Sequence, residues 1–205
     1  MGATHAYDLK KTYAMIAGGY ERTHQGDIDL ASLEVFASRM PKQAQILDLG
    51  AGNGRDSSWF AEHGFAVTMF DLSPEMLTIA QKKVPTAKAV LGDMTEMNFK
   101  NESFDGVWAR ASLLHLTKEE GKQVVKKVFE ILKKGGTFCL RLKEGSGESE
   151  VVEDKYGKAA KRFFSFYSED EATNLLSSVG FQNIQSQFEV SKSNVAWVQV
   201  WGVKK

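Results

Sequence analysis

Short apolar runs and helical patterns alternate along the chain from residue 45 onward. Each apolar run has the length of a buried strand, and the next segment repeats its apolar residues every three or four positions, as an amphipathic helix does. The predicted strands are 45–49, 65–70, 87–91, 104–109 and 137–142, and the predicted helices are 54–63, 73–83 and 118–133. Strands joined through helices run parallel, so the pattern predicts an α/β fold with a mostly parallel sheet.

The end of the chain follows a different pattern. After a helix that Ser168 opens and Gly180 ends, two strand-like runs at 181–189 and 195–203 flank the turn signal at 191–194. This arrangement predicts a hairpin and therefore an antiparallel edge of the sheet. We find no repeat, linker or second core in the sequence, and we expect one domain over residues 1–205.

Two segments fall outside the alternation. Residues 1–40 predict an N-terminal helical cap, with one helix at 7–24 that Gly18-Gly19 weakens and a second at about 28–39 that Asp27 would cap. Residues 143–166 begin with a long polar run that bears glycine and shows little core pattern. We expect a lid-like surface insertion there.

The run ILDLGAGNGRD at Ile46–Asp56 predicts a buried strand that ends in a tight turn and leads into a helix. Gly50, Gly52 and Gly54 permit positive φ and a close approach of a ligand to the backbone. The start of the following helix offers unpaired N–H groups. The run therefore favours a small polar ligand of the nucleoside kind.

Three further strands also end in polar residues. Asp71 follows the second strand, Gly92-Asp93 the third, and Arg110 to Ser112 the fourth. Ligands of parallel sheets bind beyond the carboxyl ends of the strands, where Asp71 would accept hydrogen bonds from ribose hydroxyls and Asp93 would suit an adenine amino group. Any one of these residues could be a tight connection or a solvated cap, but their succession at strand ends favours one shared site.

Two common nucleotide motifs do not fit this turn. The glycines read G-A-G-N-G instead of G-x-G-x-x-G, and Arg55 stands where the dinucleotide motif has its third glycine. No G-K-[ST] follows the glycines, which excludes a P-loop.

The charge balance gives no sign of a polyanionic partner. The chain has 26 Lys and Arg against 26 Asp and Glu, so its net charge is zero, and we expect neither nucleic acid nor membrane as a partner. The single cysteine, Cys139, excludes an internal disulfide and agrees with a reducing compartment. With no signal-peptide pattern at the N-terminus, we expect a cytoplasmic protein.

Four segments resemble the class I S-adenosylmethionine-dependent methyltransferases: ILDLGAGNGRDSSWFAEHGFAVTMFDLSPEML, VLGDM, SFDGVWARASLLHL and EILKKGGTFCLRLKEG. The resemblance extends over about residues 7–203, and it is closest to small single-domain members with A-S-L-L-H after the fourth strand and R-F-F-x-x-Y after the lid. It implies a Rossmann-like three-layer sandwich whose seven-stranded sheet has the order 3-2-1-4-5-7-6, with the last strand antiparallel. It also implies S-adenosylmethionine as cofactor and S-adenosylhomocysteine as product.

The resemblance also assigns cofactor-binding residues by position. In this family the first turn holds the methionine part of the cofactor, the acid after the second strand holds the ribose, residues after the second and third strands meet the adenine, and N-terminal tyrosines close over the ligand. The matching positions are Tyr13, Tyr20, Asp48, Gly50, Gly52, Asn53, Asp71, Leu72, Met76, Asp93, Met94 and Arg110.

Methyl transfer is an in-line displacement at an already activated sulfonium, so the protein mainly supplies alignment, and we expect no metal. An oxygen or nitrogen acceptor can require a base, for which His115 is the candidate; the alternative is that it only orients its loop. Arg162 and Tyr167 are candidate acceptor-binding residues beneath the insertion, or anchors of the lid. We favour a small-molecule acceptor and a monomer or homodimer, with tRNA or protein methylation and a non-catalytic cofactor-binding regulator as alternatives.

Overall fold

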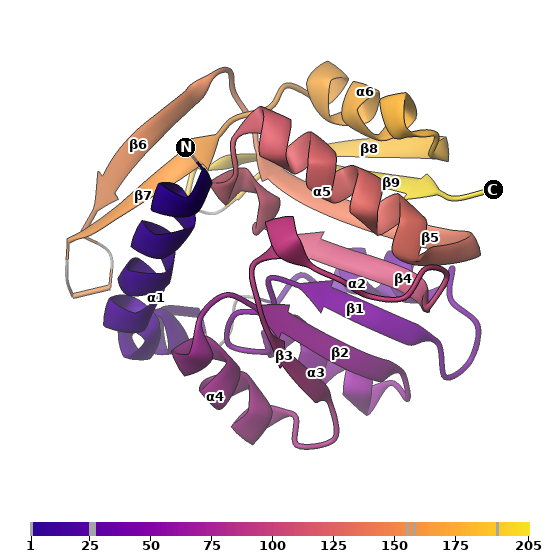
Figure 1. Ribbon diagram of the computed structural model, residues 1–205, viewed down its shortest axis with the longest axis horizontal. Coiled ribbons are helices and arrows are strands. Elements are labelled where there is room, and N and C mark those ends of the chain that lie inside the picture. Colours follow the sequence, from indigo (N-terminus) through magenta and orange to yellow (C-terminus); the bar gives the residue numbers. More distant parts are fainter. Residues whose placement is uncertain (1, 25–27, 155, 158, 192) are drawn as a thin grey trace.

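The computed structural model describes residues 2–24, 28–154, 156–157, 159–191 and 193–205 (Figure 1). In chain order the elements are α1 (Gly2–His24), α2 (Leu30–Ala37), β1 (Gln45–Leu49), α3 (Arg55–Glu62), β2 (Ala66–Asp71), α4 (Pro74–Lys83), β3 (Lys88–Leu91), the 3₁₀ helix η1 (Met94–Glu96), β4 (Phe104–Arg110), the 3₁₀ helix η2 (Leu113–His115), α5 (Lys118–Ile131), β5 (Leu132–Lys143), β6 (Glu148–Glu153), β7 (Ala160–Ser165), α6 (Glu169–Val179), β8 (Gln182–Val190) and β9 (Ala196–Val203).

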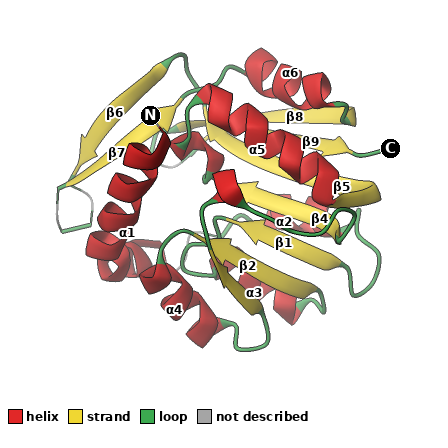
Figure 2. Cartoon of the chain, viewed as in Figure 1, coloured by secondary structure: helices red, strands yellow, loops and turns green. Residues whose placement is uncertain are grey.

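Seven strands form one sheet in the order β3-β2-β1-β4-β5-β9-β8 (Figure 2). β1 to β5 are parallel, and β9 runs antiparallel to both β5 and β8. The predicted fold class and strand order are therefore confirmed. The central strand β1 pairs with β2 on one side and β4 on the other, with Ile46 opposite Val67 and Gly106. This register brings the turn after β1 to the middle of the sheet's carboxyl edge.

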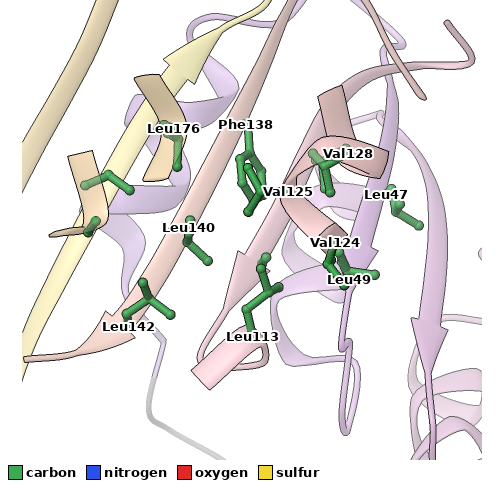
Figure 3. Packing of buried hydrophobic residues seen from close by; sticks show 14 of the residues in the cluster. Leu47, Leu49, Leu113, Val124, Val125, Val128, Phe138, Leu140, Leu142 and Leu176 are labelled. Carbon is green, nitrogen blue, oxygen red and sulfur yellow. The ribbon is translucent and has the colours of Figure 1, made fainter. Parts of the chain in front are cut away.

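Helices cover both faces of the sheet. On one face, α5 packs Val124 and Val128 against Leu47 and Leu49 of β1, and α6 adds Leu176 (Figure 3). On the other face, α2, α3 and α4 pack against a cluster centred on Trp108 of β4, whose ring lies 5.2 Å from that of Phe36 and 5.6 Å from that of Phe60. Because both faces are buried, the inner strands are apolar almost throughout, as the sequence pattern predicts.

The N-terminal helix α1 is continuous through Gly18-Gly19, so the interruption that glycine propensity suggests is not present. Packing against the hairpin explains why position 19 is glycine. A Cβ built on Gly19 would lie 2.3 Å from the backbone oxygen of Tyr156, so only glycine lets the helix approach the hairpin this closely. The cap at Asp27 lies outside the described residues; the side chain of Asp29 caps α2 by accepting from the backbone N–H of Ser32 at 3.2 Å.

The polar segment after β5 is not the coreless insertion that its composition predicts. β6 and β7 pair as an antiparallel hairpin, a separate two-stranded sheet that lies beside α1 (Figure 1). Ala160, Arg162 and Phe164 form a buried row along β7, and Tyr156 next to the hairpin tip is buried as well. The row alternates with more exposed residues, a strand signal that the surrounding charges hid.

Candidate active site

The turn after β1 is built by its three glycines. Gly50, Gly52 and Gly54 all have positive φ, at 82°, 54° and 73°. The backbone N–H of Gly50 donates to the carbonyl of Phe70 at 2.8 Å, and a Cβ on Gly50 would lie 2.3 Å from the Cβ of Ser112. The turn is thus pressed between the end of β2 and the loop after β4, in a backbone conformation that side chains disfavour.

Asp71, at the end of β2, holds this turn in place. Its carboxylate accepts from the backbone N–H of Gly52 at 2.8 Å and from that of Ser73 at 2.9 Å. Burial raises the pKa of Asp71, although these backbone hydrogen bonds oppose the shift. The carboxylate therefore sits fixed at the mouth of the turn, next to Leu72 and Ser73.

A cavity opens at the carboxyl ends of β1, β2 and β4, and α1 covers it. It brings together eleven of the twelve predicted cofactor-binding residues: Tyr13, Tyr20, Asp48, Gly50, Gly52, Asn53, Asp71, Leu72, Met76, Met94 and Arg110. The twelfth, Asp93, lines a second cavity, which shares Leu72, Met94 and His115 with the first. Asp93 accepts from the backbone N–H of Thr95 at 2.8 Å, so part of its hydrogen-bonding capacity is used within its own loop.

Charged side chains from β1, α3 and β4 line the floor of the cavity. Asp48 is buried, and burial together with the neighbouring Asp56 raises its pKa to about 7, although the Ser57 hydroxyl donates to it at 2.6 Å. Asp56 is also buried, but Arg55 and Arg110 hold its pKa below the usual value. The two neighbouring carboxyls therefore differ in protonation near neutral pH.

Arg110 is the least satisfied cation of this floor. Its guanidinium lies 3.7 Å from Asp56 and 3.9 Å from Asp29, beyond hydrogen-bonding distance, and its buried Nε has no partner. Both acids already have closer partners, because Asp56 accepts from Arg55 at 2.7 Å and Asp29 from Arg141 at 2.6 Å. A guanidinium with open donors at a cavity wall is suited to binding a carboxylate.

Tyr13 and His115 meet at the other end of the cavity. The Nδ1–H of His115 donates to the carbonyl of Phe163 at 2.9 Å, which leaves Nε2 to accept from the Tyr13 hydroxyl at 3.0 Å. Burial lowers the pKa of His115 to about 3, and the positive charges of Arg162 and Lys143 act in the same direction. The imidazole is therefore neutral at ordinary pH, and its acceptor nitrogen faces the tyrosine.

The remaining predicted residues lie at different distances from the cavity. Tyr20 lines it and stacks on His24, with ring centroids 4.1 Å apart. Arg162 does not line it, but its Nη1 lies 3.4 Å from the Tyr13 hydroxyl. Tyr167 lies outside it, beside Glu144 and under the Lys118 ammonium, so the structure does not bring it to this site.

Asp56 and Glu21 are two of the lining or supporting residues that the sequence did not predict. Asp56 stands two residues after the last glycine of the turn, and the folded sheet brings Trp108 and Arg110 to its buried carboxylate. Glu21 accepts from the side-chain amide of Asn53 at 2.5 Å and pairs with Lys83, tying α1 to the turn. Glu21 carries no motif; its position one residue after Tyr20 was the available hint.

The described residues contain no group of three or more His, Cys, Asp or Glu side chains arranged to hold a metal ion. No helix in the described ranges is both long and apolar enough to cross a membrane.

Comparison with known proteins agrees with this geometry. Residues 46–136 match the family model described as "Methyltransferase domain". YqeM of Bacillus subtilis, which bears the name of a methyltransferase, is 36% identical over 120 residues, or 56% of this chain and 49% of that protein. An uncharacterized methyltransferase of Synechocystis is 31% identical over 144 residues, or 67% of this chain and 65% of that protein. The chain thus matches about half of the length of the first relative and just under two thirds of the second.

Solved structures support the same fold. The Burkholderia thailandensis 1,6-didemethyltoxoflavin-N1-methyltransferase, solved with 1,6-didemethyltoxoflavin and S-adenosylhomocysteine, superposes with a TM-score of 0.80 at 21% identity, covering 100% of this chain and 91% of that one. The match at 46–136 and the two sequence relatives identify the chain as a member of the class I S-adenosylmethionine-dependent methyltransferases, and the superposition shows that it has the same fold.

Proposed function

We propose that this protein transfers the methyl group of S-adenosylmethionine to a small molecule and releases S-adenosylhomocysteine. The observation that carries the proposal is that the glycine turn, Asp71, Asp48 and Arg110 line one cavity at the strand ends. The small-molecule acceptor is supported by the structural neighbour, whose bound ligand is 1,6-didemethyltoxoflavin, and by the zero net charge of the chain.

The cavity fits the chemistry of the cofactor. S-adenosylmethionine ends in an amino acid, and the cavity offers buried Asp48 and Asp56 for an ammonium and the open donors of Arg110 for a carboxylate. In this proposal Asp71, which lines the cavity, binds the ribose hydroxyls, and Leu72, Met76, Met94 and Asp93 of the two adjoining cavities bind the adenine. The backbone of Gly50 and Gly52, with Asn53, completes the methionine end.

The bound cofactor supplies a sulfonium methyl group that is already activated for displacement. The chain's own residues have to align the acceptor, exclude water and remove a proton where the acceptor is a protonated oxygen or nitrogen. Tyr13 and Tyr20 of α1 close the cavity from above, and Tyr20 packs against Tyr156 with ring centroids 5.5 Å apart. In our proposal, residues 1–40 act as a cap and residues 143–166 as the adjoining lid of one domain.

Proton removal, where it is needed, involves His115 through Tyr13. The lone pair of Nε2 already accepts from the Tyr13 hydroxyl, so an acceptor proton would pass to the tyrosine oxygen as the tyrosine proton passes to His115. The Nδ1–H bond to Phe163 fixes the tautomer that this role requires. A pKa of about 3 makes the imidazole a weak base in the absence of ligands.

The test has two steps. Calorimetric titration with S-adenosylhomocysteine should show saturable binding with a stoichiometry of one per chain. Incubation with methyl-deuterated cofactor and a metabolite extract, followed by mass spectrometry, should then show a labelled small molecule. Tight cofactor binding without any labelled product would contradict the transferase function, and label on tRNA or protein alone would contradict the small-molecule acceptor.

A further inference from the structure

Arg162 is a buried cation that the cofactor cavity does not use. It belongs to the inner row of β7, beside α1 (Figure 1), and only 7% of its surface is exposed. Its guanidinium lies between two aromatic rings, 5.4 Å from the centroid of Tyr156 and 5.1 Å from that of Phe164. A charge in such a dry environment is costly unless its donors are met.

The donors of Arg162 are only partly met. Nη2 is paired with Glu153 across the hairpin, and Nη1 lies 3.4 Å from the Tyr13 hydroxyl, which is a long contact. Nε is buried and has no hydrogen-bond partner. A guanidinium carries five N–H groups in a planar fork, and buried donors are normally satisfied. Arg162 therefore keeps unused donors beside a residue that lines the cofactor cavity.

A second cation, Lys143, adds positive charge next to Arg162. Lys143, the last residue of β5, lies with its ammonium 3.8 Å from the centroid of the Phe164 ring and 3.9 Å from Glu153. Arg162 and Lys143 thus both contact the carboxylate of Glu153. The positive field of the pair also reaches His115, whose pKa both cations lower. The groups that converge here come from β5, η2, β6, β7 and α1.

We propose that Arg162, supported by Lys143, binds an anionic group of the methyl acceptor, a carboxylate or a phosphate, next to the Tyr13 hydroxyl. This inference rests on the proposed function and narrows its substrate class. Arg162 does not line the cofactor cavity but contacts Tyr13, which does, so an acceptor whose anion lies at Arg162 would extend along Tyr13 and His115 toward the methyl group. Arg110, which does line the cavity, is left to the carboxylate of the cofactor.

The test titrates inorganic phosphate and acetate, at constant ionic strength, into protein saturated with S-adenosylhomocysteine, and records the shift of the unfolding midpoint. We expect a saturable shift with at least one anion. A stronger response to phosphate would indicate a phosphorylated acceptor, and a stronger response to acetate a carboxylic acid. No saturable shift with either anion overturns the inference.

Three variants locate the anion. Arg162→Gln should weaken the apparent affinity about tenfold or more, the loss expected for a charge-assisted hydrogen bond. Glu153→Gln removes the competing carboxylate and should strengthen it several-fold. Lys161→Gln is the matched control, because Lys161 is the next residue on β7, removes the same charge and is 62% exposed in its pair with Glu150. Equal weakening by Arg162→Gln and Lys161→Gln would overturn the inference.

The design separates this inference from the proposed function. Should Arg162→Gln fail to fold, Glu153→Gln still decides, since an unchanged or weaker anion affinity in that folded variant contradicts the role of Arg162. Binding of S-adenosylhomocysteine is measured first in the wild-type protein. Its absence would contradict the proposed cofactor, whereas cofactor binding without an anion response would contradict only the charge assigned to the acceptor.

Discussion

The site has two halves, one that we propose binds the cofactor and one that we propose binds the acceptor, and they are built in different ways. The cofactor half consists of short loops that directly follow β1, β2 and β4, and backbone groups do much of the work, as where Gly52 donates to Asp71. The acceptor half is assembled from α1, η2 and the hairpin, and side chains do the work: the Tyr13 hydroxyl meets Arg162 across 149 residues of sequence. The first half is fixed by the sheet that carries it, whereas the second depends on two peripheral elements remaining docked.

The two halves should also respond to pH in opposite directions. The pKa of His115 is about 3 in the folded protein, below its ordinary value of 6.5, so the unfolded chain takes up a proton first as pH falls. His115 therefore lowers the free energy of unfolding as pH falls from about 6.5 toward 3, by roughly 1.4 kcal/mol per pH unit. Above about pH 6.5 it has no such effect. Asp48 has a folded pKa of about 7, above 3.8, so its contribution is present below pH 3.8 and is lost as pH rises through 7.

Urea unfolding at several pH values measures both effects. His115→Gln should remove the loss at low pH, so that its stability relative to the wild type rises as pH falls from 6.5 to 4. Asp48→Asn should remove the loss at high pH and gain relative stability of up to about 4 kcal/mol as pH rises from 4 to 7. Each variant is the control for the other, because the two proteins have the same titratable groups apart from His115 and Asp48. Parallel pH curves for the three proteins would show that neither group titrates as its burial requires.

Asp71→Ala should produce the largest loss of cofactor affinity. The variant removes a carboxylate that we assign to two ribose hydroxyls and that also fixes the backbone of Gly52. Hydrogen bonds to a charged group contribute about 1.5–3 kcal/mol each, so the affinity for S-adenosylhomocysteine should fall at least about 100-fold in calorimetry. Asp105→Ala is the control, because Asp105 also accepts a backbone N–H, that of Gln45, but at the start of β4 instead of a carboxyl end. Similar losses in both variants would remove the ribose assignment.

The difference between the two halves also explains which parts of the site can be predicted from the sequence. The glycine turn, Asp71 and the strand order depend on local patterns, because each polar residue stands next to the strand that positions it. The contacts of Tyr13 with His115 and Arg162 join residues 102 and 149 positions apart, and no local pattern encodes them. The hairpin was hidden for a further reason: its buried row includes Arg162, and a charged residue in an inner row reads as surface.

Gly50→Ala should destabilise the cofactor half by a steric clash in addition to backbone strain. Gly50 has φ 82° and Gly64 has φ 83°, so alanine at either site pays a similar penalty of about 1–2 kcal/mol. A Cβ on Gly50 would lie 2.3 Å from the Cβ of Ser112, whereas Gly64 has nothing within 4 Å. Overpacking should therefore cost Gly50→Ala about 1–3 kcal/mol more in urea unfolding, together with cofactor affinity. Equal stabilities of the two variants would mean that the loop after β4 moves away from the new methyl group at little cost in free energy.

The acceptor half offers a matched pair of its own at Gly18 and Gly19 of α1. A Cβ on Gly19 would lie 2.3 Å from the backbone oxygen of Tyr156, but one on Gly18 would meet only the Arg22 side chain, at 3.7 Å. Alanine favours a helix over glycine by about 1 kcal/mol, so Gly18→Ala should stabilise α1 by up to that amount. Gly19→Ala gains the same propensity but has to push α1 away from the hairpin.

Hydrogen exchange of α1 and β7 amides separates these outcomes. Gly19→Ala should exchange faster in both elements and lose the packing of Tyr20 against Tyr156, while the amides of β1 and β2 keep their protection, because the sheet core does not depend on the cap. Gly18→Ala should exchange at the wild-type rate or more slowly. Faster exchange in β1 and β2 of Gly19→Ala would show that the two halves unfold as one unit, and the distinction between a fixed cofactor half and a docked acceptor half would then fail.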